Sequence, residues 1–121
     1  MESLFLKSEG DNPKNRIWDF LITYQEYDHS MKDIAKQSKV AYSTLKLLWP
    51  YFEDNGIAIQ TRNVGKAKMY KLNMKNPITK AFINYYYVIV KKETNKMMGD
   101  KEEYLIVSDE GVTADAKNGA L

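Results

Sequence analysis

The sequence predicts an α+β domain that is mostly α-helical, with three short helices, a β-hairpin and an additional C-terminal helix. Three observations predict it. The pairs Asn12-Pro13 and Asn76-Pro77 each mark a helix start, because Asn caps a first turn and Pro suits the first helical position. Two alternating apolar segments, 57–62 and 68–72, flank a connector containing Gly65. Residues 78–98 contain neither glycine nor proline, which favours a helix there although 83–90 is rich in β-forming residues.

The first predicted helix follows Pro13 and ends around residues 27–29. The side chains that recur at helical spacing form its buried stripe, with Trp18 beside them: Ile17, Phe20, Leu21 and Tyr24. Ser30 and Asp33 form a capping box that opens a second helix, which ends near Lys39.

The third predicted helix covers residues 42–55 and ends before Gly56, a left-handed position suited to glycine. Its inner stripe is Leu45, Leu48, Trp49 and Phe52. In the hairpin, the alternation directs four side chains toward the core: Ile57, Ile59, Tyr70 and Leu72. The connector of this hairpin is expected at 63–67. Residues 99–121 form an acidic tail in which 104–107 is a candidate docking strand.

Composition excludes several function classes for these 121 residues. The chain has no cysteine and one histidine, which excludes disulfides, thiolate chemistry and a multi-histidine metal site. No nucleophile–base set or phosphate-binding glycine loop is evident, so we predict neither an enzyme nor a cofactor. The longest apolar run is too short for a membrane span, and the first residues do not form a signal peptide, so a cytoplasmic location is expected.

The net charge of +2 hides an uneven distribution. Residues 30–75 hold nine basic and three acidic residues, a net charge of +6, whereas residues 1–29 carry −3 and residues 93–121 carry −4. A basic block of this kind indicates either a polyanion partner or a solvated lysine-rich surface.

The order of elements, three helices and then a hairpin, is that of a winged helix-turn-helix. Ala35 is small where the second and third helices cross, Val40 fills the turn, and Leu45 anchors the third helix. That helix then presents its N-terminal face to a DNA major groove, with the hairpin, or wing, on the backbone or in the minor groove. The candidate DNA contacts are Lys39, Tyr42, Ser43, Thr44, Lys46, Leu47, Arg62, Lys66 and Lys68.

Residues 4–77 resemble the archaeal winged-helix transcriptional regulators related to the ArsR and MarR groups. The resemblance is carried by 12–14, 16–21, 33–35, 43–50, 55–57 and 61–73, and most specifically by the wing pattern Arg-x-x-Gly-Lys-Ala-x-x-Tyr-x-Leu at 62–72. It implies sequence-specific binding to double-stranded DNA and regulation of transcription, usually as a homodimer. Ala41 stands where such sequences usually carry Ser, and Ala can neither cap a helix nor donate to a phosphate.

The expected organisation is a DNA-binding domain at 1–75, a dimerisation helix at 76–98 and the tail at 99–121. The apolar face of the C-terminal helix is the expected dimer interface, with Phe82, Tyr85, Tyr86 and Ile89 at its centre. The alternative functions are a winged-helix module that binds proteins instead of DNA and an RNA-binding accessory protein. The operator, the regulated genes, the direction of regulation and any effector do not follow from the sequence.

Overall fold

The computed structural model describes residues 3–99, so the predicted strand at 104–107 and most of the acidic tail lie outside the described residues. Helices and strands follow one another along the chain in this order: α1 (Leu4–Glu9), α2 (Pro13–Thr23), β1 (His29–Ser30), α3 (Met31–Ser38), α4 (Tyr42–Asp54), β2 (Ala58–Val64), β3 (Ala67–Leu72) and α5 (Pro77–Met98). The three strands form one antiparallel sheet in the order β1-β3-β2.

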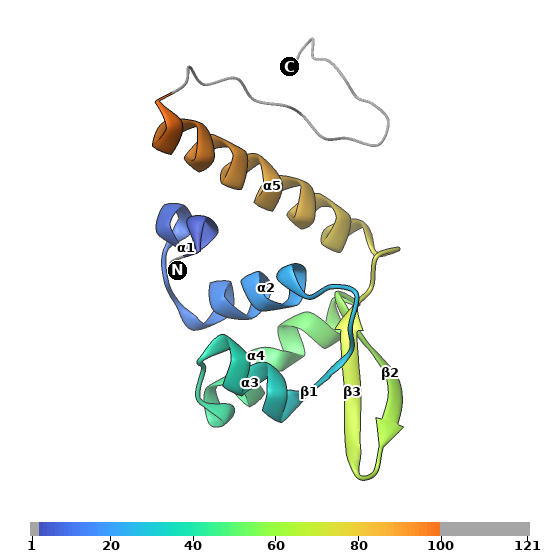
Figure 1. Cartoon of the computed structure of the whole chain (residues 1–121). Helices are drawn as coiled ribbons and strands as arrows, with labels where there is room; N and C mark the ends of the chain where they lie inside the picture. Colours follow the sequence, from blue (N-terminus) through green and yellow to red (C-terminus); the bar gives the residue numbers. More distant parts are fainter. Residues whose placement is uncertain (1–2, 100–121) are drawn as a thin grey trace.

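Helix α2 lies at the centre of the domain, between α5 on one side and α3 with α4 on the other (Figure 1). The hairpin of β2 and β3 extends away from the helices, and α5 packs on α1. The core is formed by side chains with almost no exposed surface, among them Ile17, Ile34, Leu45 and Phe52. Trp18 also belongs to this core, as the sequence predicts.

The predicted starts of α2, α3 and α5 are confirmed, and each depends on a side chain that satisfies first-turn N–H groups. The backbone N–H of Asn15 donates to the Asn12 side chain at 2.9 Å, and that of Asp33 donates to the Ser30 hydroxyl at 3.1 Å. At α5, the Asn76 side chain accepts from two backbone N–H groups, at 2.8 and 3.2 Å. Gly56, two residues after the end of α4, has a φ of 71°, which confirms the left-handed position.

Several expectations about the elements are wrong. Helix α1 and strand β1 are not anticipated, and α2 ends at Thr23 rather than near residues 27–29. The strands of the hairpin are longer than expected, so the connector is the two-residue turn Gly65-Lys66 and not 63–67. Ile59 is 41% exposed because it pairs with Lys71 on the outer face, whereas its neighbour Ala58 pairs with the buried Leu72.

Candidate nucleic-acid interface

Helix α4 divides its side chains between the core and solvent. Leu45, Trp49 and Phe52 are buried, and this packing turns the opposite side of the helix outward. The exposed residues on that side are Ser43, Lys46, Leu47 and Pro50. Within 42–50, Lys46 is the one charged residue, and the acidic residues of α4 are confined to its last turn. The outward face is therefore free of negative charge over most of its length.

The start of α4 has no side-chain cap. Its N-cap is Ala41, which makes no side-chain hydrogen bond, as its methyl group dictates. The first backbone N–H groups of a helix have no acceptor within the helix. In α4 the cap residue does not supply an acceptor side chain either. Tyr42 is 39% exposed beside this end, with the Lys46 ammonium 5.0 Å from the centre of its ring. The first turn of α4 thus has N–H donors that no cap side chain satisfies, and the Lys46 ammonium lies over the Tyr42 ring of the same turn.

The middle of the hairpin is bonded to the loop that precedes β1. The Arg62 guanidinium makes two bonds to the Asp28 carboxylate, at 2.9 and 3.1 Å, and the Thr61 hydroxyl donates to the same carboxylate at 2.6 Å. These hydrogen bonds, that from Arg62 above all, lower the pKa of Asp28 to about 2. Arg62, a predicted DNA contact, therefore also anchors the hairpin, and Asp28 is an anchor that sequence reasoning missed.

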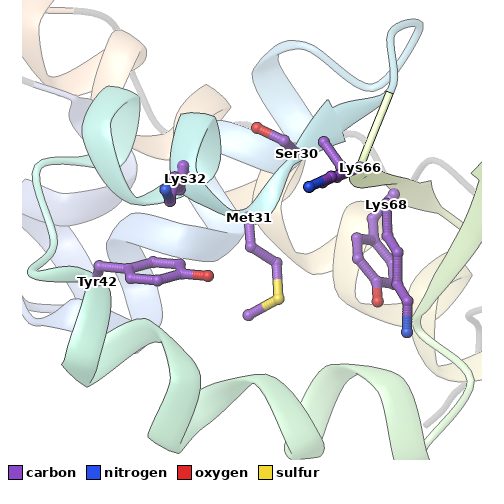
Figure 2. A pocket seen from close by; sticks show the side chains of 8 residues that line it. Ser30, Met31, Lys32, Tyr42, Lys66 and Lys68 are labelled. Carbon is purple, nitrogen blue, oxygen red and sulfur yellow. The ribbon is translucent and has the colours of Figure 1, made fainter. Parts of the chain in front are cut away.

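A cleft of about 390 Å³ lies between the hairpin and the starts of α3 and α4. Its lining is Ser30, Met31, Lys32, Tyr42, Lys66, Ala67, Lys68 and Tyr70. Figure 2 shows the Met31 side chain in the middle, with Tyr42 on one side and the hairpin lysines on the other. Three lysines and no acidic residue line the cleft, so its rim is basic.

The cleft brings together Tyr42, Lys66 and Lys68 from the predicted DNA contacts, and it adds Lys32. Lys32 is not among the DNA contacts predicted from the sequence. Its position just after the Ser30 cap, at the start of the second predicted helix, is a signal that could have identified it. Ser43, Lys46 and Leu47 continue the same surface along α4, with Thr44 half-buried beside them.

Lys39 lies apart from this cleft. It occupies the turn between α3 and α4 with a φ of 60°, and its carbonyl accepts from an Arg16 Nη1–H at 2.8 Å. It lines a second cleft together with Asp11 and Arg16. The structure therefore shows a role for the Lys39 backbone in the turn, and the role of its side chain stays a prediction.

The predicted dimer face of α5 is mostly covered within the chain. The Phe82 ring stacks on the Trp18 ring with 3.8 Å between the ring centres, and the Tyr86 ring stacks on the Phe5 ring with 4.8 Å between the ring centres. Tyr86 is 8% exposed and Ile89 is 9% exposed. Phe5 of the unanticipated helix α1 contacts Phe82 and Tyr86, so much of this face packs within one chain. The role of Phe82, Tyr86 and Ile89 in a dimer interface stays a prediction.

Tyr85 is the exception on that face, since 44% of it is exposed and its hydroxyl donates to the Glu9 carboxylate. A shallow apolar surface remains around it at the start of α5, formed by Pro77, Ile78, Ala81, Phe82 and Tyr85.

Within residues 3–99, no group of three or more acidic, histidine or cysteine side chains is arranged to hold a metal ion. None of the helices described there is long and apolar enough to cross a membrane.

The fold is shared with solved structures of low sequence identity. The transcriptional regulator BldR from Sulfolobus solfataricus is 17% identical, with a TM-score of 0.56 over 81% of this chain and 71% of BldR. MepR, a transcription regulator of the Staphylococcus aureus multidrug efflux pump MepA, is 18% identical, with a TM-score of 0.53 over 79% of each chain. Lactococcus lactis ZitR is 14% identical, with a TM-score of 0.53 over 70% of this chain and 65% of ZitR.

This chain therefore spans slightly less than two thirds of ZitR. No family model and no curated protein sequence matches it. The shared architecture confirms the predicted α+β winged helix-turn-helix. The finer resemblance, to archaeal regulators related to the ArsR and MarR groups, rests on the motif residues alone and stays a prediction.

Proposed function

We propose that the protein is a sequence-specific, double-stranded DNA-binding regulator of transcription. The observation that carries this proposal is a surface that runs from the exposed part of α4 at residues 43–50 across the lysine-lined cleft to the turn of the hairpin, with lysines and no acidic residue among the side chains that line it. BldR and MepR, which share the fold, are transcriptional regulators.

The dimensions of this surface suit a duplex. An α-helix with its side chains is about 10–12 Å wide, and the major groove of B-DNA is about 12 Å wide. With α4 in the groove, the Ser43 and Lys46 side chains face the base edges. The hairpin, held by the pair of Asp28 and Arg62, then lies over the adjacent backbone or minor groove.

The basic cleft supplies the electrostatic part of binding. Lys32, Lys66 and Lys68 approach it from α3 and from the hairpin, so a backbone phosphate between the two elements meets ammonium groups on both sides. The uncapped N–H groups of α4 face the same polyanion at Ala41. These contacts position the protein on DNA without reading its sequence.

The proposal includes a homodimer in the cytoplasm, because a two-fold dimer presents two copies of α4 to two half-sites. We propose that the exposed apolar surface at the start of α5, around Ile78 and Tyr85, makes this contact. Ile78→Asp places a charge there, and sedimentation is expected to show a shift from dimer to monomer relative to the parent. A parent that is monomeric at tens of micromolar contradicts the dimer but not DNA binding.

The main experiment is a titration with duplex DNA at several salt concentrations. The logarithm of the association constant falls with the logarithm of salt concentration, with a slope of about −0.9 for each neutralised phosphate. Lys66→Ala and Lys68→Ala are each expected to weaken binding to all sequences and to flatten this slope by about one unit per subunit. Lys80→Ala, an exposed lysine on α5, is the matched control and should leave the slope unchanged.

The competing function is that of a protein-interaction module. It is favoured if the parent and both hairpin variants bind duplex DNA equally weakly and without salt dependence. Single-stranded RNA added as competitor separates the RNA-binding alternative, because RNA should then displace the duplex.

A further inference from the structure

The most exposed large hydrophobic side chain in the described part of the chain lies in the middle of the proposed DNA-binding helix. Leu47 is 82% exposed, and Pro50 beside it on the same side of α4 is exposed as well. A single exposed leucine is ordinary on a protein surface. Its place is informative here, because Ser43 and Lys46 extend the same face toward the start of the helix.

Lys46 is the one side chain on this face that can read a base by paired hydrogen bonds, to guanine. Arginine, asparagine and glutamine, which make the other common bidentate contacts to guanine and adenine, do not occur in residues 42–50. The Lys46 ammonium lies over the Tyr42 ring, toward the start of α4. Between Lys46 and the last turn of α4, the exposed groups are the aliphatic surfaces of Leu47 and Pro50.

One feature of a base edge in the major groove suits an aliphatic side chain, namely the 5-methyl group of thymine. Leu47 follows Ser43 by four residues, so it lies about 6 Å further along the helix axis, close to two base-pair steps. Contact with a thymine methyl removes apolar surface from water on both partners.

We infer that Leu47, supported by Pro50, is a specificity-determining residue that recognises thymine through its 5-methyl group. This inference rests on the proposed binding of duplex DNA. It specifies one base that the protein recognises. Each half-site contains a thymine opposite the middle of α4, and Lys46 contacts the neighbouring base or phosphate.

The experiment compares thymine with deoxyuridine, which lacks only the methyl group. A duplex is first selected by the parent protein from a pool with a random central segment. Each thymine of the selected duplex is then replaced in turn by deoxyuridine, and the dissociation constant is measured. At one position per half-site the replacement is expected to weaken binding by about fourfold, the equivalent of burying one methylene group.

Two variants assign that loss to the side chain. Leu47→Ala should bind the thymine and deoxyuridine duplexes equally, whereas Leu47→Met, which keeps an aliphatic chain, should retain the preference. Met97→Ala, which removes another exposed apolar side chain at the far end of α5, is the matched control and should behave as the parent does. Thermal unfolding should be unchanged in all three variants, because both positions are exposed.

The outcomes separate the inference from the function beneath it. If the parent selects no duplex from the pool, the proposed DNA binding itself is wrong. If the parent selects a duplex but is indifferent to every replacement, or if Leu47→Ala keeps the full preference, DNA binding stands and thymine recognition by Leu47 is overturned.

Discussion

Two regions of the molecule differ in whether their side chains contact one another: the layer formed by α1 and α5, and the surface formed by α4 and the hairpin. In the first, aromatic rings stack on one another, and two tyrosine hydroxyls donate to carboxylates of other helices. In the second, Lys66 and Lys68 make no ion pair within residues 3–99, and Leu47 projects into solvent. Side chains that pack and hydrogen-bond with one another, as between α1 and α5, stabilise the fold. Charged and apolar side chains without such a partner in the described part of the chain, such as Lys66, Lys68 and Leu47, are suited to binding another molecule.

This contrast predicts that substitutions in the two regions affect different measurements. The largest effect is expected for Phe5→Ala, because the Phe5 ring is 1% exposed and contacts both Phe82 and Tyr86. Its removal leaves a cavity between α1 and α5 and should lower the free energy of unfolding by about 3–5 kcal/mol. Urea unfolding measures the loss.

The matched control is Leu47→Ala, which shortens an exposed side chain and should change the free energy of unfolding by less than about 0.5 kcal/mol. An unfolding midpoint for Phe5→Ala equal to that of the parent would contradict the packing of α1 on α5. The contrast between the two regions would then lose its basis.

A smaller effect is expected for Tyr86→Phe, which removes one hydroxyl and keeps the ring. The Tyr86 hydroxyl donates to an Asp19 carboxylate oxygen at 2.5 Å, and the Ser3 hydroxyl donates to the same oxygen at 3.0 Å. Burial, together with the hydrogen bond to Asp19, raises the pKa of Tyr86, so the group stays protonated and keeps donating. Loss of this bond should cost about 1–2 kcal/mol of unfolding free energy.

Chemical denaturation of the Tyr87→Phe variant provides the comparison, because the Tyr87 ring is 43% exposed and its hydroxyl makes only a long contact with Gln25. If both tyrosine variants lose the same unfolding free energy, the hydrogen bond from Tyr86 to Asp19 does not stabilise the fold more than an exposed hydroxyl does.

Local signals in the sequence predict most of the helix-turn-helix. The two Asn-Pro pairs and Ser30 act within one helical turn, so the sequence alone locates the starts of α2, α3 and α5. The inner stripe of α4 is also predictable, because the spacing of Leu45, Trp49 and Phe52 is helical.

The features that sequence reasoning missed depend on contacts between distant residues. Phe5 and Tyr86 are 81 positions apart, so no pattern within a short window shows that α1 covers α5. The bond between Asp28 and Arg62 joins residues 34 positions apart, and both side chains alone resemble ordinary surface charges. The candidate site shows the same division: the α4 face follows from helical periodicity, whereas the contribution of Lys32 to the cleft requires the tertiary fold.

The smallest effect on stability is expected for Asp28→Asn, which tests whether Arg62 belongs to the fold or to the binding surface. The pKa of Asp28 is lowered from 3.8 to about 2 in the folded protein. Its stabilisation is therefore complete above pH 3.8 and is lost as the pH falls toward 2. The difference in melting temperature between the parent and Asp28→Asn should be present at pH 6 and vanish near pH 2.

The same substitution releases the Arg62 guanidinium, which can then neutralise a phosphate. If Asp28 withholds Arg62 from DNA, the salt slope of Asp28→Asn should steepen by up to about 0.9 per subunit, even though the hairpin is less firmly held. Asp11→Asn is the matched control, because Arg16 pairs with Asp11 in the same way, at 2.5 Å, but away from the hairpin. An unchanged slope in Asp28→Asn, with the melting difference retained, assigns Arg62 to the fold alone and leaves Lys66 and Lys68 as the cations of the hairpin that contact DNA.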